Sequence, residues 1–258
     1  MDNNIISALL LTVFAGLSTG FGSLIALFAK RTNTKFLSLS LGFSAGVMIY
    51  VSMIEIFAKA KDYLISANGE GIGSWLCVLA FFGGIIIIAL IDFFIPSTES
   101  DIGAGKSNNA LNRMGIMTAL AIAIHNFPEG MATFTSALKD PYLGSAIAVA
   151  IAIHNVPEGI ATSLPIYFST GKRMRAFIIS FLSGITEPLG AIIGYLILKP
   201  FFNDTVFGLL FSAVAGIMVF ISLEELIPMA HEYEKSKVTI VGVIIGMIIM
   251  AVSLMLFM

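Results

Sequence analysis

The sequence contains few charged residues. Asp, Glu, Lys and Arg make up 12% of the 258 residues, whereas soluble domains carry about 25%. Hydrophobic residues reach 57%, and the near balance of 14 basic and 16 acidic side chains leads us to expect no nucleic-acid partner. The single cysteine, Cys77, excludes an intrachain disulfide. This composition excludes a soluble protein and indicates an all-α polytopic membrane protein.

Long polar stretches are scarce as well. A membrane-spanning helix needs about 20 apolar residues, whereas a membrane barrel would show strands of about 10 alternating residues. The short connections between the apolar runs predict one transmembrane domain over residues 1–258, with a cytoplasmic loop at about 96–112. Eight candidate spans lie near residues 5–29, 36–58, 74–95, 112–138, 142–168, 174–198, 205–230 and 238–257.

Basic residues are distributed unevenly between alternate loops, and loops rich in Lys and Arg stay in the cytoplasm. Four lie on one side of the predicted spans: Lys59, Lys61, Lys139 and Lys199. Ten lie on the other: Lys30, Arg31, Lys35, Lys106, Arg113, Lys172, Arg173, Arg175, Lys235 and Lys237. The second side should be cytoplasmic, so both termini should face outward. The first span lacks a basic segment before it and reads as a retained helix.

A polar block is repeated inside two of the apolar runs. His125-Asn-Phe-Pro-Glu129-Gly recurs as His154-Asn-Val-Pro-Glu158-Gly, and 11 of 13 positions match over the longer segments 121–133 and 150–162. A charged residue at the bilayer centre costs roughly 3 kcal/mol on insertion scales, so such residues usually mark a function. The repetition predicts a membrane-embedded metal site.

Helical geometry explains how each block could bind a metal. Residues four apart differ by about 40° around a helix, so His125 and Glu129 share one face, as do His154 and Glu158. Asn126 and Asn155 are rotated by about 100° from the preceding histidines and can bind at a neighbouring coordination position. Imidazole with carboxylate oxygen suits Zn²⁺ and other first-row divalent ions. The two helices could hold one metal ion or a carboxylate-bridged pair.

Other acidic residues lie in the spans. Glu187, within Gly-Ile-Thr-Glu-Pro of span 6, is a candidate third carboxylate, unless Thr186 or a serine satisfies it. Acids near the predicted span ends could form steps of an ion pathway, or could simply reach the membrane interface. These residues are Glu55, Asp92, Glu224 and Glu225.

A second, weaker repeat relates spans 2 and 7. Residues 45–56 and 215–226 are identical at five of twelve positions, and most other differences exchange similar apolar residues. The two spans should run in opposite directions, which predicts a 3+2+3 arrangement with inverted outer triplets. Secondary transporters often use inverted repeats, with the substrate site near the midplane. A chance match of short apolar blocks is the alternative.

The paired His-Asn-x-Pro-Glu-Gly blocks and the Glu-Pro-Leu-Gly element of span 6 resemble the ZIP family of divalent metal transporters, specifically its bacterial ZupT-type branch. The resemblance covers essentially the whole chain. It implies a protein of the bacterial cytoplasmic membrane that takes up Zn²⁺, and also Fe²⁺, Mn²⁺ or Co²⁺, towards the cytoplasm. It implies no prosthetic group, a homodimer in many members, and movement of spans 1, 4, 5 and 6 against spans 2, 3, 7 and 8.

The resemblance also implies a binuclear site between spans 4, 5 and 6. One ion would be held by His125, Glu129, His154 and Glu158. The second would be held by Asn126, Asn155 and Glu187, with Glu129 and Glu158 as bridges. Many relatives carry histidines in the loop between spans 3 and 4. That loop has none here, which leaves metal handover through it doubtful.

Two other functions remain open from the residues alone. An intramembrane metalloenzyme would need a metal with an open position and a base to activate water. The sequence lacks His-Glu-x-x-His, and an inverted duplication favours a path over a one-sided active centre. A cation-coupled transporter of organic solutes could use the carboxylates as proton sites, but the paired histidines argue against it. We therefore expect a transporter and not an enzyme.

Overall fold

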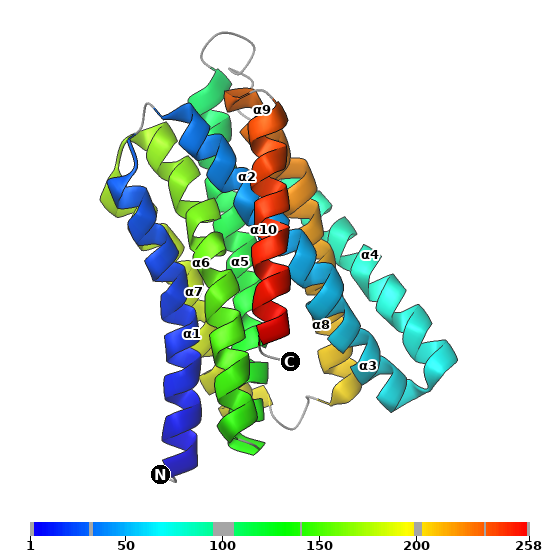
Figure 1. The fold of residues 1–258 in the computed structure, drawn as a ribbon. Coiled ribbons are helices and arrows are strands. Elements are labelled where there is room, and N and C mark those ends of the chain that lie inside the picture. The colour runs from blue at the N-terminus through cyan, green and yellow to red at the C-terminus, as the bar shows by residue number, and fades with distance from the viewer. Residues whose placement is uncertain are drawn as a thin grey trace.

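The computed structural model describes residues 3–30, 33–94, 106–139, 141–198, 203–234 and 236–256. These residues form eight long helical stretches and no strands (Figure 1). Three stretches contain a π-helical turn, labelled η. The elements are α1 (Asn3–Phe28), α2 (Thr34–Val51), η1 (Ser52–Ile56), α3 (Phe57–Asn68), α4 (Glu70–Phe94), α5 (Lys106–Lys139), α6 (Pro141–Thr170), α7 (Arg173–Ile193), η3 (Gly194–Leu198), α8 (Asp204–Phe220), η4 (Ile221–Leu226), α9 (Ile227–Tyr233) and α10 (Ser236–Leu256).

Seven of these stretches are long and apolar enough to cross a membrane. The eighth, α5, is less apolar because it begins with the polar segment Lys-Ser-Asn-Asn and contains Arg113 in addition to the block around His125. It nevertheless lies inside the bundle, in contact with α1, α6, α7 and α8. Both termini lie towards the lower end of the molecule in Figure 1, as an even number of crossings requires. The all-helical membrane architecture is confirmed.

The helical stretches are longer than the apolar runs. The predicted second span ended near residue 58, but α2, η1 and α3 form one helix to Asn68. Charged Lys59 and Lys61 are exposed on this extension, whereas Ala60 and Leu64 are buried. The predicted loop 96–112 is also too long, since α5 begins at Lys106, while residues 95–105 lie outside the described part. An apolar run marks the part of a helix that lipid surrounds, and the helix can continue beyond it.

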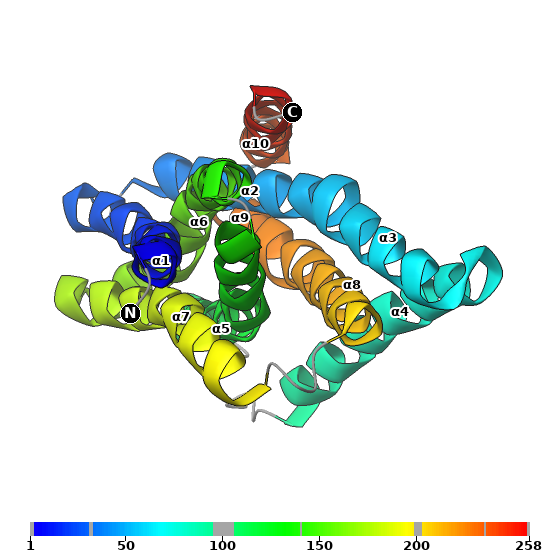
Figure 2. The same cartoon turned by 90° about the horizontal axis from the view of Figure 1, so that it is seen from below.

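The helices pack as two groups. In one, α1, α5, α6 and α7 contact each other closely, and in the other α2 pairs with α10 while α3, α4 and α8 pack together. Figure 2 shows α10 and the α3–α4 pair at the edge of the molecule. The groups touch mainly where α2 meets α6 and where α5 meets α8. At the first of these contacts, Ser44 donates a hydrogen bond of 2.8 Å to the Pro157 carbonyl oxygen.

Glycines set the closest helix crossings. A Cβ at Gly130 of α5 would overlap the Glu187 carbonyl of α7, and one at Gly46 of α2 would overlap the Val243 carbonyl of α10. Among the described glycines, each one whose Cβ would overlap a neighbouring main chain faces a helix of its own group. Close main-chain packing therefore holds each group together and does not join the two.

The weak repeat of spans 2 and 7 has a structural counterpart. Along residues 45–56 and 215–226, all twelve aligned positions are equally buried, half-buried or exposed. Both segments also contain a π-helical turn, at η1 and at η4. Turns of this kind are rare in proteins, but those that occur often lie at functional sites. The similarity of the two segments thus extends to their backbone, whereas the full 3+2+3 arrangement stays a prediction.

Candidate metal centre

The polar blocks of α5 and α6 face each other in the middle of the first group. The imidazole rings of His125 and His154 lie with their centroids 6.1 Å apart. Both helices run through their internal prolines, Pro128 and Pro157, without a break. All seven predicted ligand residues are at most 5% exposed: His125, Asn126, Glu129, His154, Asn155, Glu158 and Glu187. The structure therefore brings every one of them into one closed, buried region.

Glu129 lies between the two imidazoles. One carboxylate oxygen, Oε1, is 3.0 Å from His154 Nε2, and the other, Oε2, is 3.1 Å from His125 Nε2. Potential ligand atoms of these three residues all lie within 4.8 Å of one another, which is close enough to surround one metal ion. The Oε1 atom of Glu158 approaches the same His125 nitrogen at 3.7 Å. Two imidazole nitrogens and two carboxylates thus converge as the sequence predicts.

Glu187 joins the site from α7. The absence of a side chain at Gly130 lets α5 cross directly against the Glu187 main chain. One Glu187 oxygen accepts a hydrogen bond of 2.9 Å from the Asn155 amide, and the other oxygen has no partner among the described residues. The alternative in which Thr186 satisfies this carboxylate is wrong, because the Thr186 hydroxyl donates to the Ser183 carbonyl instead.

Both asparagines use their NH₂ groups to bind protein and leave their oxygens free. Asn126 donates to the Ser183 carbonyl at 3.2 Å, and Asn155 donates to the Ala15 carbonyl at 2.9 Å as well as to Glu187. The Oδ1 atom of each has no hydrogen-bond partner in the described part of the chain. The sequence did not reveal the Ala15 and Ser183 carbonyls, because a main-chain contact leaves no signal in the residue type.

The site contains an unusual excess of unpartnered polar atoms. Buried polar atoms normally find a hydrogen bond, and leaving one without a partner costs about 1–3 kcal/mol. More than half of the buried side-chain nitrogens and oxygens without a partner in the described residues belong to these seven residues. They include both ring nitrogens of each histidine and both oxygens of Glu158, because the approaches of 3.0–3.7 Å between the histidines and the glutamates lack hydrogen-bond geometry. Such a cluster could surround a bound cation, with three carboxylates to balance its charge.

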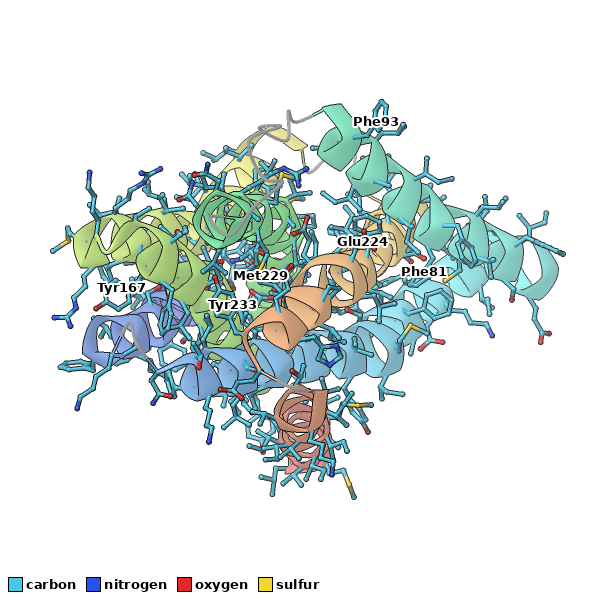
Figure 3. The ribbon with its side chains drawn as sticks, turned by 90° about the horizontal axis from the view of Figure 1, so that it is seen from above. Phe81, Phe93, Tyr167, Glu224, Met229 and Tyr233 are labelled. Carbon is cyan, nitrogen blue, oxygen red and sulfur yellow. The ribbon has the colours of Figure 1, made fainter. Side chains whose placement is uncertain are left out.

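The predicted pathway acids occupy different surroundings. Glu55 lies inside a continuous helix rather than at its end and pairs with Lys59 at 2.7 Å. Glu224 is exposed and Glu225 is half-buried on η4. Figure 3 shows Glu224 on the helix that continues through α9. Asp92 belongs to α4, but its side chain lies outside the described part of the structure.

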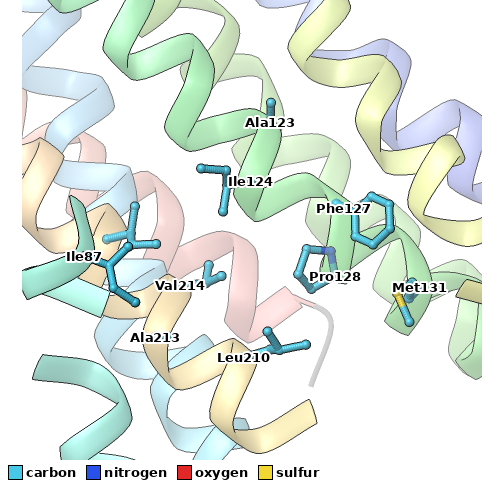
Figure 4. A pocket seen from close by; sticks show the side chains of 10 residues that line it. Ile87, Ala123, Ile124, Phe127, Pro128, Met131, Leu210, Ala213 and Val214 are labelled. Carbon is cyan, nitrogen blue, oxygen red and sulfur yellow. The ribbon is translucent and has the colours of Figure 1, made fainter. Parts of the chain in front are cut away.

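An apolar cavity of about 610 Å³ lies beside the site. Residues of α4, α5 and α8 line it, among them Ile87, Pro128 and Leu210 (Figure 4). Its lining contains no charged residue, so it is not a binding place for a cation. It does mark a stretch where the two groups of helices are not in contact.

The fold and the site together define a helical membrane protein with a buried cluster of histidine and glutamate side chains. A family model described as ZIP Zinc transporter matches residues 96–254. The chain is 60% identical to the zinc transporter ZupT of Streptococcus mutans, with all of both chains covered. It is 57% identical to the zinc transporter ZupT of Lysinibacillus sphaericus and 56% identical to that of Clostridium perfringens, with at least 97% of each chain covered.

The chain therefore belongs to the ZIP family, in its ZupT branch. The members of this family are transporters, which excludes the metalloenzyme alternative. The names of these relatives specify zinc as the transported metal. In this chain, the buried cluster of His125, Glu129 and His154 is the feature that could bind such an ion.

Proposed function

We propose that this protein carries divalent first-row metal ions, above all Zn²⁺, across a bacterial cytoplasmic membrane into the cell. The cluster of unpartnered nitrogen and oxygen atoms around Glu129 is the observation that carries the proposal. Relatives over the full chain length that are named zinc transporters support it. Neutral imidazole with carboxylate oxygen, and no thiolate, binds such ions firmly but reversibly, as transport requires. The same ligands suit Fe²⁺, Mn²⁺ and Co²⁺.

We propose two ion positions in the site. The first is formed by His125, His154 and the two glutamates that approach them. The second is formed by the free oxygens of Asn126 and Asn155 with the unpartnered oxygen of Glu187. Three ionised carboxylates carry one more negative charge than a single divalent cation can balance, which supports a second ion.

The ion would enter from outside and leave to the cytoplasm. The ten basic residues at one end of the helices, against four at the other, support this orientation, with both termini outside. Glu55 would attract ions on the outer side, and Glu224 and Glu225 on the inner side, with Asp92 as a further candidate.

We propose that the group of α1, α5, α6 and α7 moves against the other group to expose the site alternately. The closed site and the glycine contacts confined to each group support this motion. The Ser44–Pro157 hydrogen bond and the apolar cavity lie where the groups would slide past each other.

Uptake of radiolabelled Zn²⁺ into proteoliposomes tests the proposal. Wild-type protein should admit the ion, whereas His154→Ala and Glu158→Ala should not. Normal uptake by both variants would refute the site. Wild-type protein that binds no divalent metal would revive the hypothesis of a cation-coupled solute transporter.

Two further measurements address the number and the kind of ions. Counting bound zinc per chain by mass spectrometry distinguishes two ions from one. Competition of Fe²⁺, Mn²⁺ and Co²⁺ with zinc uptake gives the ranking of these metals.

A further inference from the structure

Among the described residues, five buried hydroxyl groups outside the metal centre have no hydrogen-bond partner: those of Thr19, Ser52, Thr118, Thr162 and Ser253. Thr118 and Thr162 are the two of these that lie on the ligand-bearing helices α5 and α6. Ser and Thr in helices usually donate to a carbonyl one turn earlier. Buried Thr12, Thr133 and Ser163 do so at 2.5–3.0 Å. Thr118 of α5 and Thr162 of α6 are fully buried, but neither hydroxyl finds a partner among the described residues. An unsatisfied hydroxyl lowers stability, so each needs another explanation.

The two threonines lie at the same level of the α5–α6 pair. These helices run antiparallel, and their register is fixed on one side by the facing rings of His125 and His154. On the other side, a Cβ at Gly115 would lie 3.1 Å from the Thr162 carbonyl oxygen. Thr118, one turn after Gly115, is therefore placed opposite Thr162.

Both threonines continue the ligand-bearing faces of their helices. At about 100° per residue, Thr118 lies within about 20° of His125 and Glu129 around α5. Thr162 lies about 40° from Glu158 and about 6 Å further along α6. Along this face, Thr162 is the next polar residue beyond Glu158, and Thr118 is the next polar residue before His125, with Ile122 between Thr118 and His125.

Apolar side chains lie beside both threonines. Met114, Met117 and Leu164 are fully buried at neighbouring positions of α5 and α6. A cation in a dry apolar stretch loses its hydration without compensation. Oxygen ligands at this point would lower that barrier. Because they are neutral, they would not trap the ion.

We propose that Thr118 and Thr162 form a transit site for the divalent cation between the metal centre and the end of the bundle where α5 begins and α6 ends. This inference rests on the proposed transport function. The two hydroxyl oxygens contact an ion that retains part of its water. They act on the rate of passage and leave the affinity of the metal centre unchanged.

The double variant Thr118→Val/Thr162→Val tests this assignment, because valine keeps the shape and removes the hydroxyl. The initial rate of radiolabelled Zn²⁺ uptake at saturating zinc should fall roughly tenfold, the effect of one lost polar contact. The Kd for Zn²⁺, measured by equilibrium dialysis of the purified protein, should not change. The Thr118→Ser/Thr162→Ser variant should transport at the wild-type rate.

Thr12→Val is the matched control, since the Thr12 hydroxyl is equally buried but bonds to the Ala8 carbonyl of its own helix. It should alter neither the uptake rate nor the Kd. Wild-type uptake by the double valine variant would overturn the transit site. So would an equal loss of binding and uptake, which would assign the hydroxyls to the metal centre itself. If the double variant does not fold, the single valine variants decide, and either must slow uptake. Failure of the wild type to transport zinc would instead refute the proposed function.

Discussion

At the scale of single residues, Glu129 is the centre of the site. Each of its two oxygens approaches a different imidazole, so both histidines depend on one carboxylate. Neither Glu158 nor Glu187 approaches both rings in this way. Glu129 is consequently the residue whose charge matters most for holding a cation at this place.

Glu129→Gln should therefore abolish tight zinc binding. The substitution keeps the size of the side chain and removes the charge between the rings. The Kd for Zn²⁺ should rise by more than the roughly 10–100-fold that follows loss of an outer-sphere partner. Isothermal titration with a competing chelator measures it. Glu70→Gln, at the exposed start of α4, is the control and should bind as wild type does. Unchanged affinity in Glu129→Gln would contradict the geometry.

Asn155→Asp should destabilise the metal-free protein and be rescued by zinc. The new carboxylate would face the Glu187 carboxylate and the Ala15 carbonyl, where an amide now donates. The loss should be about 1–3 kcal/mol, seen as a lower melting temperature. Added Zn²⁺ should restore it, because the cation compensates the extra charge. Asn68→Asp removes a similar double donor far from the metal centre, so zinc should not rescue that variant. Equal rescue of both variants would contradict a direct role of Asn155.

At the scale of helices, the site depends on how closely α5 and α7 cross. Gly130 is the point of closest approach, and the main chain of Glu187 fills the space where a side chain would be. Gly130 binds nothing itself, but its lack of a side chain determines whether the Glu187 carboxylate reaches those of Glu129 and Glu158.

Gly130→Ala should separate the helices and impair uptake. A methyl group at this position would overlap the Glu187 carbonyl oxygen, and overpacking of this kind costs about 1–3 kcal/mol. Gly83→Ala is the control, since nothing lies within 4 Å of its added Cβ. That change should be neutral or stabilising by up to about 1 kcal/mol through helix propensity. Zinc uptake and melting temperature of the two variants give the comparison, and equal behaviour would contradict the proposed role of the crossing.

The sequence predicted the elements better than their ends. Apolar runs located the spans, and the repeated block correctly paired α5 with α6. The runs did not reveal that α3 extends the second span to Asn68, because Lys59 and Lys61 read as a loop although they occupy the exposed side of a helix. The carbonyl partners of Asn126 and Asn155 were equally hidden, since any residue can supply a main-chain oxygen.

At the scale of the whole molecule, the metal centre belongs entirely to one group of helices. Every predicted ligand lies on α5, α6 or α7, and α1 supplies the Ala15 carbonyl that orients Asn155. The second group supplies none of the predicted ligands and contacts α6 through the hydrogen bond from Ser44 to the Pro157 carbonyl oxygen. A site contained in one rigid group can move as a unit without losing its ligands, which is what alternating exposure demands.

Labelling of introduced cysteines should establish the orientation in the membrane. In a Cys77→Ala background, Glu70→Cys and Lys172→Cys place exposed thiols at opposite ends of the helices. A membrane-impermeant thiol reagent should label Glu70→Cys in intact cells and Lys172→Cys only after permeabilisation, as the distribution of basic residues predicts. The reverse pattern would place the termini in the cytoplasm and overturn the proposed direction of uptake.

The paired π-helical turns bear on the history of the chain. A π-helical turn holds one residue more than the α-helix around it, and η1 and η4 carry that extra residue at matching places of the two related segments. If the two segments descend from one ancestral half, a single insertion before its duplication explains both turns with fewer events than two separate insertions. Deleting the residue from one copy would rotate everything beyond it by about 100°, turning Glu55 or Glu225 to another face.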